Sequence, residues 1–94
     1  MKLYTDEIQT AKLIELGFEK PKNEVKAEQA GDYAWYNSAY SIGELIEMLG
    51  YDLYSMHYLG MSWEVKSEQV AVINEELIDA LYDMCIKLKE KGVI

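Results

Sequence analysis

The chain has 94 residues, of which nine are basic and seventeen acidic, so its formal net charge at pH 7 is −8. All nine basic residues are lysines, so the chain lacks the forked arginine donor that commonly binds guanine and phosphate. This composition argues against direct binding to nucleic acid or to anionic membrane surfaces. Half of the residues are apolar, which excludes a disordered chain and predicts a single domain over residues 1–94.

The sequence predicts neither a targeting segment nor a membrane segment. No run of about 18 apolar residues is present, so no transmembrane helix is expected. The N-terminal residues become acidic at once and include no apolar stretch, which argues against a secretory signal peptide. The single cysteine, Cys85, cannot form an internal disulfide. We therefore expect a cytoplasmic protein in a reducing compartment.

The N-terminal part predicts a helix followed by a hairpin. The helix spans residues 5–16, with Thr5 as its N-cap and Gly17 as the residue that ends it. Residues 24–37 predict a β-hairpin, because an Ala-Gly-Asp turn separates an alternating first arm from a second arm rich in aromatic residues. The first arm is only weakly hydrophobic, so a hairpin and a loop both remain open for this segment.

The central part predicts a short helix and the first two strands of a meander. The helix covers residues 41–49, because Ser41 and Glu44 have the spacing of a capping box. Residues 51–59 place three aromatic or sulfur-containing side chains on one face of a strand. Residues 61–66 alternate apolar and polar side chains, which is typical of a half-buried strand.

The C-terminal part completes the predicted fold. A third strand over residues 69–73 would finish the antiparallel meander, and Asn74 would cap a last helix over residues 75–91. Apolar residues recur in this helix at helical spacing, with acids near its start and lysines near its end. The sequence therefore predicts an α+β fold: an antiparallel sheet of three to five strands with about three helices, packed mainly on one face.

Acidic and aromatic residues gather in the middle of the chain. Residues 31–86 contain one lysine and ten acidic residues, a balance of −9, and more tyrosine and tryptophan than so small a core can bury. These two aromatic types are enriched at binding hot spots, although cross-strand aromatic pairs can also serve only to stabilise a sheet. We predict an acidic, tyrosine-rich surface that contacts another protein or a second copy of this chain. Its predicted contact residues are Tyr33, Trp35, Tyr36, Tyr54, Tyr58 and Trp63.

No catalytic residue, metal site or cofactor is predicted. His57 is the only histidine and has no second ligand nearby, and Cys85 lies on the apolar face of the last helix, where a thiol is inert. Two acidic pairs at helical spacing are explained by helix starts and exposed helix faces, and no general acid–base role is predicted for them. These pairs are Asp79 with Asp83, and Glu44 with Glu47.

Three function classes follow from these observations. The first is a small non-enzymatic module that binds a protein. The second is an inhibitor whose acidic face imitates nucleic acid and blocks a nucleic-acid-binding host protein; its affinity would depend strongly on salt. The third is a small-ligand carrier or an enzyme with a pocket between sheet and helices near His57.

Several segments resemble a group of small uncharacterised proteins encoded by gut bacteria, their prophages and other mobile elements. The resemblance rests on SIGELIEML (residues 41–49) and ELIDALYDM (residues 76–84), and on the opening ELGFEKP and the ending LKEKGVI. It implies a compact α+β fold and a mobile-element setting. It implies no activity and no site residue, because the shared motifs are cap and core patterns.

Overall fold

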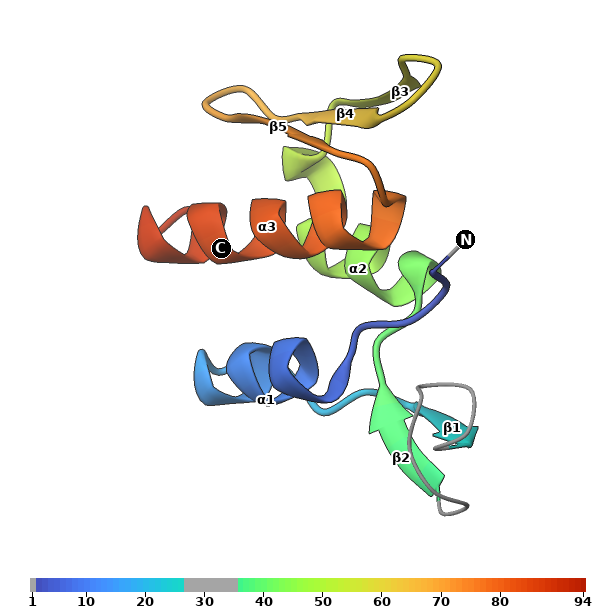
Figure 1. Ribbon diagram of the computed structural model, residues 1–94. Helices are drawn as coiled ribbons and strands as arrows, with labels where there is room; N and C mark the ends of the chain where they lie inside the picture. Colours follow the sequence, from blue (N-terminus) through green and yellow to red (C-terminus); the bar gives the residue numbers. More distant parts are fainter. Residues whose placement is uncertain (1, 27–35) are drawn as a thin grey trace.

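The computed structural model describes residues 2–26 and 36–94 and has the expected α+β architecture (Figure 1). Three helices and two antiparallel sheets make up this part of the chain. The elements in chain order are α1 (Glu7–Glu15), β1 (Asn23–Lys26), β2 (Tyr36–Ala39), α2 (Ile42–Leu49), the 3₁₀ turn η2 (Gly50–Asp52), β3 (Ser55–Tyr58), β4 (Trp63–Lys66), β5 (Ala71–Asn74) and α3 (Leu77–Glu90).

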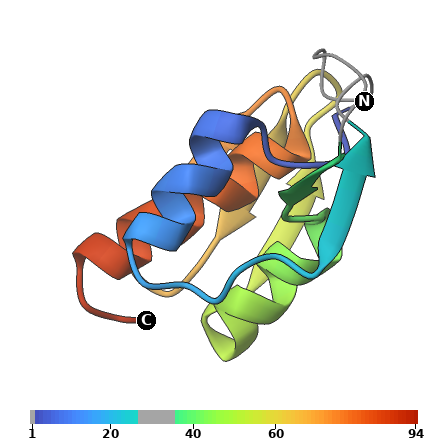
Figure 2. The ribbon, with the colours of Figure 1, turned by 90° about the horizontal axis from the view of Figure 1, so that it is seen from below.

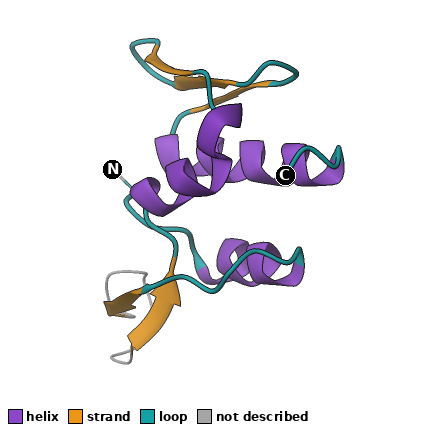
Figure 3. Ribbon diagram, turned by 180° about the vertical axis from the view of Figure 1, so that it is seen from behind, coloured by secondary structure: helices purple, strands orange, loops and turns teal. Residues whose placement is uncertain are grey.

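The two sheets lie at opposite ends of the molecule, with α2 and α3 between them (Figure 3). The three-stranded sheet β3-β4-β5 packs with one face against α3, which confirms the predicted arrangement of a sheet covered mainly on one side. Helix α1 lies on the other side of α3, beside the two-stranded sheet of β1 and β2, as Figure 2 shows from below. Helix α3 is therefore the central element.

Helix α1 begins later than predicted, because Asp6 and not Thr5 caps it. The Asp6 carboxylate accepts the Gln9 backbone N–H, and the Gln9 side chain accepts the Asp6 backbone N–H, so the two form a capping box. Thr5 is buried instead, and its hydroxyl lies 2.7 Å from that of Thr10 and accepts the Tyr40 backbone N–H. Thr5 thus ties the N-terminal segment to the end of β2.

The predicted hairpin over residues 24–37 is confirmed in part: β1 and β2 pair antiparallel, but β2 begins at Tyr36 and continues beyond the predicted end to Ala39. Asn23 pairs with Ala39 and Lys26 pairs with Tyr36, so β1 and β2 are in register along their full length. The predicted turn between the strands lies outside the described residues. The next element is also as predicted, because Ser41 and Glu44 form the capping box that begins α2.

The predicted meander is confirmed, but its first strand is shorter than expected. Residues 51–52 belong to η2, and Tyr51 is fully exposed, so the strand begins only at Ser55. Residues 59–62 connect β3 to β4, and Gly60 among them has φ +95°, a positive value that glycine adopts without steric cost. In the sheet, Met56 lies beside Val65, which lies beside Val72.

The core is built around α3. Seven of its residues are buried: Leu77, Ile78, Ala80, Leu81, Met84, Cys85 and Leu88. They pack with Val65 and Val72 from the sheet and with Leu45 and Leu49 from α2. Helix α3 begins two residues later than predicted, and its N-cap is Glu76 and not Asn74, which ends β5 and accepts the Glu76 backbone N–H.

Candidate functional site

The side of β3 that faces the helical layer is largely uncovered. Met56 and Tyr58 point to the same side of the sheet as Val65 and Val72, which are buried beneath α3, and Tyr54 directly precedes β3. Helix α3 packs on β4 and β5, so β3 extends beyond the covered area. The exposed fractions are 63% for Tyr54, 37% for Met56 and 61% for Tyr58. We name these three residues the β3 strip.

The β3 strip borders an open sheet edge, because β3 pairs only with β4 in the described structure. Leu59 donates its backbone N–H to the Ser62 carbonyl, with an N···O distance of 2.7 Å, which places residue 59 in a hydrogen-bonded pair with β4. Since such pairs alternate along an antiparallel strand, the backbone groups of Met56 and Tyr58 point to the open edge. An edge of this kind can accept an added strand.

Tyr54 stands at the start of the β3 strip, beside acidic residues. Its hydroxyl donates to Glu68 Oε2 at 3.3 Å. The negative charge of Glu68, with smaller contributions from burial, this hydrogen bond and the charge of Asp52, raises the pKa of Tyr54 above its ordinary value. Tyr54 therefore remains a neutral phenol with its ring exposed.

The other end of the β3 strip opens into a concave pocket. Tyr58, Trp63, Glu75 and Glu76 line a cavity of about 390 Å³ between the end of the β3–β4 hairpin and the start of α3. The rings of Tyr58 and Trp63 are tilted by 49°, with their centroids 5.1 Å apart. Trp63 also packs against the core, so it is half-buried while Tyr58 is exposed.

The structure brings three of the six predicted contact residues together and separates a fourth from them. Tyr58 and Trp63 are cross-strand partners on one face of the three-stranded sheet, and Tyr54 directly precedes β3. Tyr36 lies in β2, which belongs to the other sheet, and Tyr33 and Trp35 lie outside the described residues. Met56 was missed by the sequence analysis, although its period-two position between Tyr54 and Tyr58 indicates the same face.

The candidates for catalysis or metal binding are His57 and Cys85, and both have the surroundings of structural residues. His57 is exposed on the sheet face opposite the helices, where it pairs with Glu64, so it does not lie between sheet and helices. Cys85 is buried, as predicted, and burial raises the pKa of its thiol to about 12. In the part of the chain that the structure describes, no three His, Cys, Asp or Glu side chains form a group that could hold a metal ion.

The acidic pair on α3 is bound to neighbouring polar groups. Asp79 Oδ1 accepts from Lys2 Nζ at 2.7 Å and from Gln9 Nε2 at 2.8 Å. Burial raises the pKa of Asp79, but these hydrogen bonds and the Lys2 charge outweigh it and hold that pKa below its ordinary value. Burial raises the pKa of Asp83, partly offset by a hydrogen bond with Asn74. Each carboxylate thus has a structural partner.

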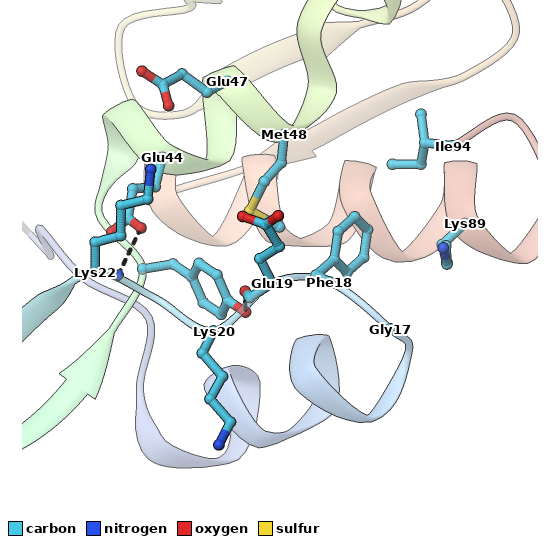
Figure 4. Close-up of a pocket in the computed structure, with 11 residues that line it drawn as sticks. Gly17, Phe18, Glu19, Lys20, Lys22, Glu44, Glu47, Met48, Lys89 and Ile94 are labelled. Atoms are coloured by element: carbon cyan, nitrogen blue, oxygen red, sulfur yellow. Dashed lines mark hydrogen bonds between the residues drawn. The ribbon is translucent and has the colours of Figure 1, made fainter.

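A second concave region lies between the α1–β1 connection, α2 and the end of α3 (Figure 4). It measures about 450 Å³, and charged residues of both signs line it. Lys22 donates its backbone N–H to Glu44, Lys89 Nζ lies 5.2 Å from the centroid of the Phe18 ring, and the Tyr40 hydroxyl donates to the Glu19 carbonyl. The mixed charge of this groove favours no class of charged ligand.

Comparison with known proteins identifies no relative, so the proposal of a function rests on the fold and on the geometry of the site. No protein-family model, curated protein or solved structure matches the chain. None of the helices in the described ranges combines the length and the apolar character that crossing a bilayer requires.

Proposed function

We propose that the protein is a small non-enzymatic module that binds another protein through the β3 strip and the open edge of β3. The observation that carries this proposal is the exposure of Met56 and Tyr58 on the face that the sheet otherwise buries against α3, together with the exposed ring of Tyr54 at the start of β3. Side chains of this size normally remain covered when their strand faces a helix. A partner that covers them would extend the apolar core of the sheet.

The chemistry of the strip supports a protein as the partner. Tyrosine supplies a large rigid ring with a polar end, and methionine adapts to irregular surfaces. The open backbone groups beside Met56 and Tyr58 can pair with an extended segment, as in recognition by strand addition. Main-chain bonding would then supply affinity, and the side chains of the β3 strip would supply specificity.

The acidic residues support nucleic-acid mimicry less well than the β3 strip supports protein binding, because many of these acids already interact with other groups of the chain. Asp79 pairs with Lys2, Glu64 lies 3.5 Å from Lys66, and Glu44 completes the α2 capping box. A mimic of nucleic acid needs a continuous array of unpaired negative charge. Affinity of a captured partner that falls steeply with salt would favour mimicry over the β3 strip.

The test compares the wild type with a Tyr54→Ser/Met56→Ser double variant, both immobilised and exposed to host lysate. We expect the wild type to retain a partner saturably and the double variant to bind that partner at least ten-fold more weakly, or about 1.4 kcal/mol. The matched control is Ile8→Ser, which makes an exposed apolar residue polar on α1. Equal retention by the double variant, or a strictly monomeric wild type that captures nothing, would contradict the proposal.

A further inference from the structure

The pocket beside the β3 strip combines two aromatic rings with two carboxylates. We propose that this pocket, lined by Tyr58, Trp63, Glu75 and Glu76, binds the guanidinium group of an arginine side chain of the partner protein. The inference rests on the proposed function, because the pocket continues the β3 strip at Tyr58. It adds the chemistry by which the partner is recognised.

The aromatic half of the pocket is held in place before a ligand arrives. The Tyr58 hydroxyl donates to the Gly60 carbonyl at 2.6 Å, which fixes the direction of the ring across the β3–β4 turn. Trp63 is fixed by its packing against the core. The faces of such rings attract cations within about 6 Å of the centroid, and tryptophan attracts them most strongly. Little conformational entropy is lost when these two side chains bind a ligand.

The acidic half of the pocket has carboxylate charge that the described chain does not neutralise. Among the side chains of residues 2–22 and 39–94, no lysine lies within ion-pair distance of Glu75 or Glu76. Glu76 Oε2 accepts the Lys2 backbone N–H at 3.0 Å, which orients this side chain. The Glu75 side chain is exposed. The two full negative charges outweigh the partial positive charge at the start of α3.

The same end of α3 already holds a cation from within the chain. Lys2 Nζ lies 2.7 Å from Asp79 Oδ1, one turn after the two glutamates that line the pocket. That ammonium is occupied by Asp79, Asp6 and Gln9. Among the described side chains, Lys2 therefore leaves the carboxylates of the pocket without a cation.

Arginine fits this pocket better than lysine. Its planar guanidinium stacks on aromatic faces and presents a fork of donors that two neighbouring carboxylates can share. An ammonium is more strongly hydrated and offers no flat surface to the rings. Since this chain contains no arginine, a second copy of it cannot supply the proposed ligand.

The first test uses the wild-type protein and three blocked tripeptides, Gly-X-Gly, in which X is arginine, lysine or citrulline, the neutral analogue of arginine. In an NMR titration, we expect the arginine peptide to shift the Trp63 indole N–H and the amides of Glu75 and Glu76. Its dissociation constant should be on the order of a few millimolar, as suits one side chain. Citrulline should bind at least ten-fold more weakly, and lysine at least three-fold. A Trp35→Phe variant assigns the indole signal.

The second test removes charge from the pocket and, as a matched control, the same charge from the far end of the β3 strip. Glu75→Gln with Glu76→Gln should weaken arginine binding at least ten-fold, whereas Asp52→Asn with Glu68→Gln should change it less than two-fold. The proposal is overturned by equal binding of citrulline or lysine, by equal losses in both double variants, or by no shift up to about 50 mM arginine peptide, roughly ten-fold above the expected constant.

Failure of the arginine-binding pocket can be distinguished from failure of the proposed function. The Tyr54→Ser/Met56→Ser variant leaves the four pocket residues in place, so it should bind the arginine peptide as the wild type does while losing the captured protein. Partner capture that depends on Tyr54 and Met56, without arginine binding, would overturn only the pocket. Arginine binding without dependence of capture on those two residues would overturn only the β3 strip.

Discussion

A polar cluster joins the N-terminal segment to the start of α3, and replacing Asp79 by asparagine tests its contribution to stability. Asp79 Oδ1 accepts from Lys2 Nζ at 2.7 Å and from Gln9 Nε2 at 2.8 Å. The side chains of Lys2 and Asp79 are 31% and 25% exposed, so water screens the pair only in part. Charged hydrogen bonds contribute about 1.5–3 kcal/mol when shielded and less near the surface. Asparagine keeps the acceptor oxygen but loses the charge, so we expect a loss of roughly 1–2 kcal/mol.

The pH dependence of this loss follows from the lowered pKa of Asp79. Burial raises that pKa. The hydrogen bonds from Lys2 and Gln9 and the charge of Lys2 lower it by more, so the net pKa lies below the ordinary value of 3.8. A carboxyl with a lowered folded pKa stabilises the protein fully above its unfolded pKa, and this contribution disappears as the pH falls through the folded pKa. The difference between wild type and variant should therefore be constant from about pH 5 to 9 and vanish in acid.

Urea denaturation followed by circular dichroism measures the loss at pH 7 and at about pH 2. For a domain of this size, 1 kcal/mol corresponds to a fall in Tm of about 4–8 °C. Glu47→Gln on the exposed face of α2 is the control and should change the free energy of unfolding by less than about 0.5 kcal/mol. A loss below about 0.3 kcal/mol for Asp79→Asn, or a loss that persists undiminished in acid, would show that the Lys2–Asp79 pair does not stabilise the fold.

Three further predictions concern the core and the helix ends. The Cys85 thiol, whose pKa burial raises to about 12, should resist iodoacetamide in the native protein at pH 8 and react only after denaturation; rapid native labelling would contradict its burial. Ser41→Ala removes the α2 capping box and should cost about 1 kcal/mol in urea denaturation, whereas Ser41→Asp should retain most of that stability. Leu81→Ala, at a fully buried position on α3, should cost about 2–5 kcal/mol; a loss below about 1 kcal/mol would show that the site collapses without a cavity.

The elements that could be predicted from the sequence have strong local signals. The Ser41–Glu44 box and the long apolar stripe of the last helix act within one turn or along one face, and both have the expected effect in the structure. Thr5 illustrates where local reasoning fails. Threonine is a good N-cap, but its hydroxyl binds Tyr40 and Thr10, contacts that depend on packing between segments distant in sequence. Asp6 then takes the capping position beside it.

The candidate site was predicted in part, for a related reason. Excess tyrosine and tryptophan indicate that some rings must reach the surface, but composition does not identify which ones. Tyr40 is buried as part of the core cluster, whereas Tyr58 is exposed on β3, beyond the strands on which α3 packs. From the sequence alone, the pocket glutamates are explained as ordinary helix-start acids. Their position beside Tyr58 and Trp63 depends on how the β3–β4 hairpin meets α3, which no local pattern encodes.

The central position of α3 has a consequence for synthesis on the ribosome. Leu13 and Tyr40, the large buried side chains of the N-terminal part, belong to a cluster whose main share comes from residues 77–88. These two residues emerge first, since chains grow from the N-terminus, and they remain without their packing partners until α3 has been translated. Until α3 forms, neither side chain has the packing partners that bury it in the folded protein. A ribosome paused before residue 77 should carry a chain in which α1 is accessible to proteases and Tyr40 is solvated, and release of the pause should protect both together.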